Sequence, residues 1–151
     1  MSLIAAIQTI GPQAAQPAPV VVDTNIVLDL LIFRDPATPP LQSALDSGQL
    51  QWLATAPMRE ELARVLTYPA IIKSIVHHAL TAEQVLAAFD GQARLVPVAP
   101  KARVTCQDPD DQKFIDLAVA YQATLLSKDK AVLACRKRLL ALGIAVQPHW
   151  P

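Results

Sequence analysis

The sequence predicts an α/β fold built on a mainly parallel sheet of about five strands. Short apolar runs rich in Val, Leu and Ile alternate with longer segments in which apolar residues recur at helical spacing. Such alternation is typical of parallel strands joined by helical crossovers. The chain has 151 residues, of which 52% are hydrophobic, so it is long and apolar enough to bury one substantial core.

The first third of the chain predicts two strands and two helices. Residues 20–22, all Val, form a β-branched run typical of a buried strand. We expect a helix over 25–33, then a loop, and then a short helix over 41–48 that ends at Gly48. Residues 50–54 predict the second strand.

Three helices are expected between the second and third strands. Pro57 falls in the first turn of the first helix, and Thr81 forms a capping box with Gln84 at the start of the third. Residues 94–99 predict the third strand, and Pro97 favours an edge position for it. The helices are expected over 56–69, 70–80 and 81–91.

The last third predicts two more helices and two more strands. Asp108 is placed to cap a helix, with Pro109 at its first position. A second helix is expected to end at Gly143. The helices are expected over 108–122 and 129–143, and the fourth and fifth strands over 123–127 and 144–148.

The segment before the first strand has the composition of a tail. It is rich in Gln, Ala and Pro, so we expect residues 1–18 to be flexible and 19–151 to form the folded domain. No apolar run approaches the ~20 residues of a membrane span, and no basic segment precedes the first apolar stretch as in a signal peptide. Two isolated cysteines, Cys106 and Cys135, are too few for a disulfide framework. A cytoplasmic protein is therefore expected.

The overall charge gives no indication of a partner. The chain carries 13 basic and 13 acidic residues, for a formal net charge of zero. Bulk electrostatics therefore predicts neither a nucleic acid nor a membrane partner, and any such partner has to be argued from local clusters.

Two acids directly follow predicted strands. Asp23 comes after the first strand and Asp129 after the fourth. Ligands of open α/β sheets bind outside the carboxyl ends of the strands, so both side chains are candidates for a site there. For either acid alone, capping of the next helix is the more ordinary role.

Two further acids lie on predicted apolar helix faces. Glu61 is three residues after Met58 and four before Val65, so it shares the apolar face of its helix. Asp111 falls near the centre of the apolar face of the helix over 108–122. A buried carboxylate is costly unless it is paired or bound to a cation. The alternatives are an acid that reaches solvent at the rim of the core and an acid that complements the helix dipole.

Together the four acids predict a divalent cation site. Four carboxylates in one cleft require protonation or cations, and oxygen donors without His or Cys favour Mg²⁺ or Mn²⁺. Such an ion polarises phosphoryl oxygens and activates water, which makes a phosphodiester a natural substrate. Lys128 and Lys130 flank Asp129, where they are candidates to hold an RNA phosphate, although a basic helix end is usually a solvated face. The acids are Asp23, Glu61, Asp111 and Asp129.

Four stretches of the sequence that contain these acids resemble the PIN domain family in their order and spacing. The matching stretches are VVVDTNIVLDLL, REELARVL, DPDDQKFIDLAV and LLSKDKAVL. Within the family, the chain looks closest to bacterial toxins of toxin–antitoxin pairs, similar to VapC-type ribonucleases. The resemblance implies an α/β/α sandwich and a metal-dependent endoribonuclease.

The resemblance also assigns roles to individual residues. It implies that the four acids bind the metal and carry the reaction, and that Asn25 and Ser127 are polar residues near the metal or phosphate. It further implies RNA as substrate, an antitoxin that inserts Arg or Lys into the site, and a possible homodimer. One departure is Lys130, which stands where some members carry a further acid.

Two other interpretations remain open. A phosphatase of the haloacid-dehalogenase type also begins with an Asp after a strand, but it needs a second Asp where this chain has Asn25. A PIN-like module without activity, engaging a basic partner peptide or RNA, is the other.

Overall fold

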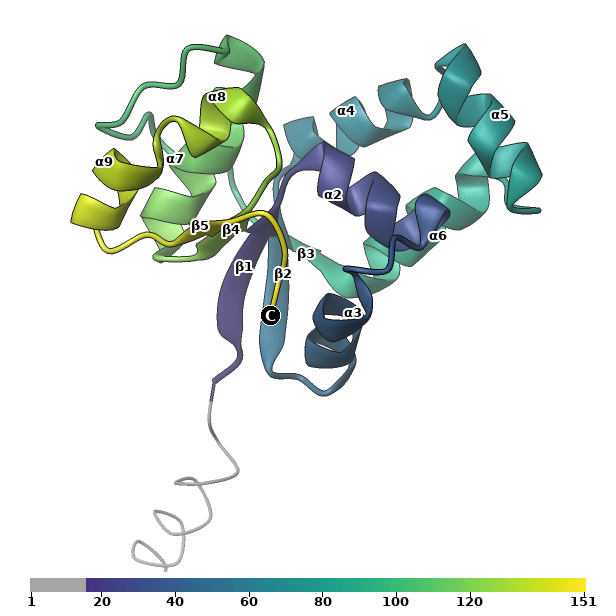
Figure 1. Ribbon diagram of the computed structural model, residues 1–151, viewed down its shortest axis with the longest axis horizontal. Helices are drawn as coiled ribbons and strands as arrows, with labels where there is room; N and C mark the ends of the chain where they lie inside the picture. Colours follow the sequence, from purple (N-terminus) through teal and green to yellow (C-terminus); the bar gives the residue numbers. More distant parts are fainter. Residues whose placement is uncertain (1–15) are drawn as a thin grey trace, which may run out of the picture.

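The computed structural model describes residues 16–151, and it confirms the α/β fold (Figure 1). Five parallel strands form one sheet in the order β3-β2-β1-β4-β5. Most of the expected tail, residues 1–15, lies outside the described residues. The strands are β1 (Ala18–Val22), β2 (Leu50–Ala54), β3 (Ala93–Leu95), β4 (Thr124–Leu126) and β5 (Val146–Gln147).

Helices connect the strands in two groups. The first group joins β1 to β2 and β2 to β3: α2 (Thr24–Leu28), the π-helix η1 (Asp29–Phe33), α3 (Pro39–Asp46), α4 (Ala56–Val65), α5 (Pro69–His77) and α6 (Ala82–Gln92). The second group joins β3 to β4 and β4 to β5: the 3₁₀ turn η2 (Pro109–Asp111), α7 (Gln112–Tyr121), α8 (Lys130–Leu133) and α9 (Arg136–Ala141).

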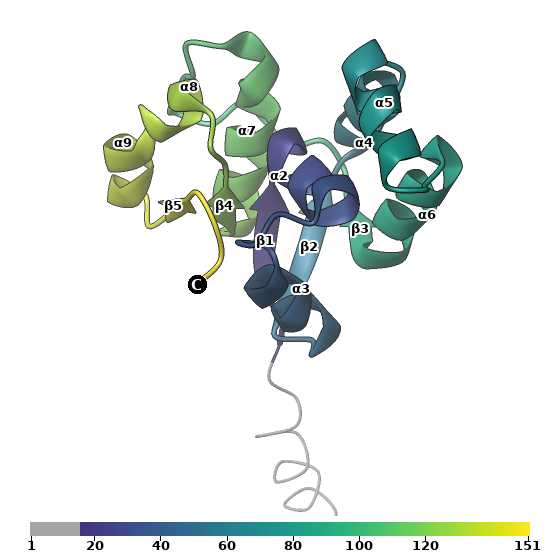
Figure 2. The same ribbon diagram turned by 45° about the vertical axis from the view of Figure 1, so that its right-hand side comes forward.

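The two groups cover opposite faces of the sheet. Crossovers between parallel strands are right-handed, and the chain runs outward from β1 to β2 and β3 but in the opposite direction from β4 to β5. The helices of the two directions must therefore lie on opposite faces. Both views show α7, α8 and α9 together on one side and α2 to α6 on the other (Figures 1 and 2). This is the expected α/β/α sandwich.

The two central strands anchor the core. Val21 of β1 pairs with Leu53 of β2 on one side and Leu125 of β4 on the other. Val21 and Leu125 are fully buried, as is Leu117 of the covering helix α7. Strands covered on both faces read as continuous apolar runs, which is why the sequence identified β1. The ends of β1 and β4 are consequently held in fixed positions.

Several elements differ in detail from the expectation. The helix expected over 129–143 is two helices, because the Cys135 N–H bonds to the Val132 oxygen in a tighter turn that ends α8. The helix expected over 25–33 changes to π-helical geometry at Asp29. The third strand is shorter than expected, but it lies at the sheet edge as predicted.

Helix ends follow the predicted caps. Thr81 and Gln84 form both hydrogen bonds of the capping box. The Asp108 carboxylate accepts the Asp110 N–H, with Pro109 at the first position of η2. In the part of the chain that the structure describes, no helix has the length and apolar character needed to cross a bilayer.

Candidate active site

The strand order reverses between β1 and β4, and this switch point forms the floor of the candidate site. The Asp23 N–H donates to the Leu126 oxygen at 2.9 Å, so the carboxyl ends of the two strands meet. One helical connection leaves toward each face here, and ligands of open α/β sheets bind at such a point, which is called the crevice below. The residues that follow the two strands are therefore brought together at this point.

Asp23 is buried in this crevice, with 3% of its surface exposed. Its side chain makes no capping hydrogen bond to α2. Instead its Oδ2 accepts a hydrogen bond of 2.6 Å from Ser127 Oγ. That hydroxyl also accepts the Asp129 N–H at 3.1 Å. Helix capping, the ordinary alternative, therefore does not describe Asp23.

Asp129 combines two roles. Its Oδ1 accepts the Ala131 N–H at 2.8 Å and so caps α8. The negative charge of the same carboxyl group also raises the pKa of Asp111, so the two acids are neighbours. Capping fixes the orientation of the carboxylate and still leaves it facing the crevice.

Asp111 enters the crevice from the η2 turn. The turn is fixed by the Asp111 N–H, which donates to the Asp108 oxygen at 3.1 Å. The Asp111 residue is 8% exposed, and its Oδ2 is buried without a hydrogen-bond partner among the described residues. A buried acceptor without a donor costs about 1–3 kcal/mol. This oxygen is the structural feature of the site that most clearly calls for a ligand.

The electrostatics of the crevice show excess negative charge. Burial and the negative charges of Asp23 and Asp129 raise the pKa of Asp111 to about 7. Burial also raises the pKa of Asp23; the Ser127 hydrogen bond opposes this and the Asp129 charge adds to it. Burial is the larger cause of both shifts, and the added effect of one carboxylate on another shows that the three acids are neighbours, here called the acid cluster.

Glu61 lies beside the cluster, but its charge is already neutralised. The Lys113 ammonium is 2.5 Å from Glu61 Oε1, and the Thr24 hydroxyl donates to Oε2. Both oxygens of this half-buried side chain are therefore engaged. The Glu61 charge still contributes to the raised pKa of Asp23, so the fourth predicted acid does reach the same crevice.

The donor set fits an oxygen-preferring divalent cation. Across residues 16–151, no three His, Cys, Asp or Glu side chains already stand in metal-binding geometry. The unpartnered Asp111 oxygen and the excess charge nevertheless match the needs of a hard cation, which binds carboxylates directly. Asp23, Asp111 and Asp129 would hold such an ion, and Glu61 would join them after a shift of Lys113.

The other predicted site residues differ in exposure, because Ser127 is buried and the rest are exposed. Asn25 is exposed, and no hydrogen bond within the described residues links its side chain to the acids. Ser127 is fully buried and binds Asp23 directly. Lys128 and Lys130 are both exposed, and the Lys128 ammonium pairs with Asp29.

Two residues of the site were not predicted from the sequence. Thr24 and Lys113 together hold Glu61, although they lie on α2 and α7. Lys113 also donates to the Asp110 oxygen. Its position two residues after Asp111 is the only signal the sequence offered, and a lone Lys on a helix is ordinarily a surface residue.

Comparisons with known proteins identify a family for the chain. None of the curated proteins matches the chain. The PIN domain family model matches residues 19–131, which is well over half of the chain and includes all four acids. PIN domains are generally nucleases and typically use divalent metals. The chain belongs to the PIN domain family.

Proposed function

We propose that this protein is a metal-dependent endoribonuclease that uses Mg²⁺ or Mn²⁺. The observation that carries the proposal is the unbalanced negative charge of Asp23, Asp111 and Asp129 at the switch point of a PIN domain. A cluster of this kind is suited to hold a divalent ion against a phosphodiester. The family alone supports a nuclease-type function, and RNA as the substrate is part of the proposal.

Each residue has a distinct part in the proposed reaction. The cation supplies charge neutralisation at the phosphate and makes water more acidic. Asp23 and Asp111 offer buried oxygens to the ion, and Ser127 holds the Asp23 carboxylate by its 2.6 Å hydrogen bond. Asp129 is oriented by its cap on α8. Lys128 and Lys130, exposed beside Asp129, bind phosphates of the RNA backbone.

The test is cleavage of single-stranded RNA in the presence of Mn²⁺. We expect Asp23→Asn to lower the rate at least about 100-fold, because the ion that acts on the phosphate loses an anionic ligand. Asp46→Asn, on the exposed surface of α3, is the matched control and is expected to keep the wild-type rate. Equal rates for wild type and Asp23→Asn would refute the proposal.

We further propose that the protein is the toxin of a toxin–antitoxin pair. An anionic crevice of this kind accepts an Arg or Lys side chain from a basic antitoxin segment, which would displace the ion. Expression of the wild type should arrest growth, and Asp23→Asn should not. Normal growth with active, soluble wild-type protein would contradict the toxin role. A homodimer belongs to the same proposal and is checked by sedimentation.

An inactive PIN module that only binds a partner is the second candidate function. The observation that favours it is the Lys113–Glu61 ion pair, which engages one of the four acids with an internal cation. Calorimetric titration with Mn²⁺ separates the candidates, since a binding module needs no divalent ion. The phosphatase alternative is not favoured, because the family match is to the PIN domain and Asn25 replaces the second acid it requires.

A further inference from the structure

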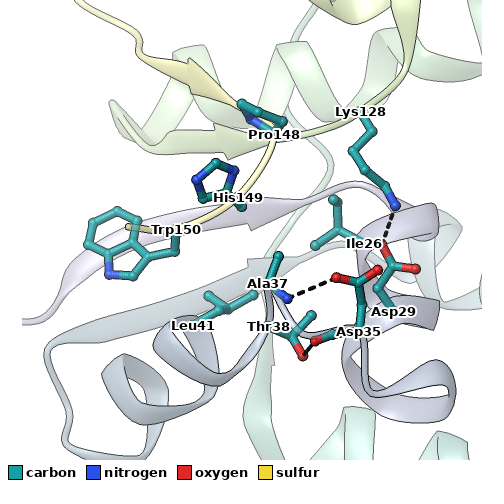
Figure 3. A pocket seen from close by; sticks show the side chains of 10 residues that line it. All are labelled: Ile26, Asp29, Asp35, Ala37, Thr38, Leu41, Lys128, Pro148, His149 and Trp150. Carbon is teal, nitrogen blue, oxygen red and sulfur yellow. Dashed lines mark hydrogen bonds and ion pairs between the residues drawn. The ribbon is translucent and has the colours of Figure 1, made fainter.

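A cavity of about 130 Å³ lies beside the acid cluster, on the face of the sheet covered by α2 and α3 (Figure 3). Its wall is formed by the start of the π-helix η1, the following loop, α3 and the segment after β5. Lys128 lines it and is the residue between Ser127 and Asp129, so the cavity adjoins the crevice. The volume is below that of sites for drug-sized ligands and suits one planar ring system.

One end of the cavity is polar. Asp29 and Asp35 line it together with Lys128, whose ammonium pairs with Asp29 (Figure 3). The loop holds Asp35 in place, because its Oδ1 accepts the Ala37 N–H at 2.9 Å and its carbonyl oxygen accepts the Thr38 hydroxyl at 2.7 Å. This end therefore presents fixed carboxylate acceptors next to an ammonium donor.

The other end is apolar and aromatic. The indole of Trp150 lies across the cavity from the acids, and Ile26 and Leu41 lie between them (Figure 3). Trp150 is half-buried, whereas Ile26 and Leu41 belong to the core. A flat ring that enters the cavity would meet an aromatic face and aliphatic side chains, and its edge would reach the charged end.

We propose that this cavity binds a guanine base of single-stranded RNA, next to the phosphate held at the acid cluster. The proposal rests on the proposed nuclease function for its substrate. Among the four bases, guanine alone offers two adjacent N–H donors and a neighbouring oxygen acceptor on its Watson–Crick edge. A carboxylate accepts both donors, and an ammonium donates to the oxygen. Asp35 accepts the two donors, and Trp150 stacks on the ring. The Lys128 ammonium has three N–H donors, so it gives one to the guanine oxygen and keeps the others for Asp29 and the adjoining phosphate.

The position of Lys128 links the two sites. Its backbone continues directly into Asp129, and its side chain reaches the cavity. A nucleotide whose base occupies the cavity would therefore place its backbone at the rim of the crevice. The cleavage position is accordingly set at a fixed distance from a guanine.

The experiment is a titration of the full chain with the four nucleoside 5′-monophosphates in EDTA, followed by tryptophan fluorescence. Trp52 is 1% exposed, so Trp150 provides the response. We expect GMP to saturate the signal with an affinity at least about tenfold above AMP, CMP and UMP. No saturation, or equal affinities for all four nucleotides, would overturn the proposal.

Two variants test the assignment of groups. Asp35→Asn is expected to lower GMP affinity at least about tenfold, because an amide cannot accept both donors. Asp46→Asn is the matched control, because Asp46 is exposed and does not line the cavity. Trp150→Ala should weaken the binding of all four nucleotides, as measured by calorimetry. Unchanged GMP affinity in folded Asp35→Asn and Trp150→Ala would also overturn the assignment.

A second arm distinguishes RNA from a free nucleotide as the ligand. Binding of a short RNA with a single guanine is measured with Asp23→Asn, because residue 23 does not line the cavity and the variant is not expected to cleave the RNA. Replacing that guanine by adenine should weaken binding about tenfold. If wild type cleaves RNA but binds no GMP, the subsite is wrong and the nuclease stands. If GMP binds but no RNA is cleaved, the nuclease is wrong.

Discussion

Glu61 and the three aspartates lie in the same crevice, but their charges are handled in opposite ways. Glu61 has an ammonium on one oxygen and a hydroxyl on the other. Asp111 has a buried oxygen to which no group in the described part of the chain donates a hydrogen bond, and its pKa is raised to about 7. The carboxylate of Glu61 is therefore paired within the protein, whereas the carboxylate of Asp111 still lacks a partner among the described residues.

The difference identifies where an external cation is needed. A protein can satisfy a buried acid with its own basic residue, as α7 does with Lys113 at Glu61. Among residues 16–151 no basic side chain pairs with the three aspartates, and Lys128, adjacent in sequence to Asp129, pairs with Asp29 instead. The three aspartates therefore need an external cation, whereas Glu61 does not.

The largest expected effect is on divalent ion affinity. Asp111→Asn should weaken Mn²⁺ binding at least about 100-fold, because the ion loses a buried anionic ligand. Glu61→Gln should weaken it less than about tenfold, since Lys113 already neutralises that acid. Isothermal titration calorimetry measures both. Equal losses of Mn²⁺ affinity in the two variants would show that Asp111 and Glu61 contribute equally to the ion site.

The next effect is on stability as a function of pH without metal. The folded pKa of Asp111 is about 7, above the unfolded value of about 3.8, so the folded state holds more protons between these values. Stability therefore falls as pH rises through this window. At pH 8, Asp111→Asn should be more stable than wild type by about 1–2 kcal/mol. Urea unfolding at pH 5 and pH 8 measures this, and a wild type more stable at pH 8 would contradict it.

The smallest effect is expected at Glu61 and has the opposite sign. Glu61→Gln breaks a half-buried ion pair and should destabilise the metal-free protein by about 1 kcal/mol at pH 8. The exposed Arg59–Asp90 pair offers a comparison, and Asp90→Asn should lower the melting temperature less than Glu61→Gln does. A stabilising Glu61→Gln would show that this acid is also left unbalanced.

The sequence was sufficient to predict the strands of the sheet and the two acids, Asp23 and Asp129, that follow β1 and β4. Val20, Val21 and Val22 identify β1 because a strand buried on both faces has no polar alternation. The break between α8 and α9 was not visible, because its apolar pattern continues across Cys135 as in one helix. Local periodicity does not report where a chain turns.

The partners of the acids could not be predicted in the same way. The hydroxyl of Ser127 was expected near the site, and it lies on Asp23. Thr24 and Lys113 were not expected at Glu61, because their contacts join α2 and α7 to α4 and depend on how helices cross. Contacts between distant segments are set by packing, which leaves little trace in residue spacing.

The most direct test of the central claim is a crystal structure of the metal-free protein soaked with Mn²⁺, examined by anomalous scattering. We expect one strong peak within coordination distance of carboxylate oxygens from Asp23, Asp111 and Asp129. A peak at Asp29 or Asp35 alone, or no peak at saturating Mn²⁺, would contradict it.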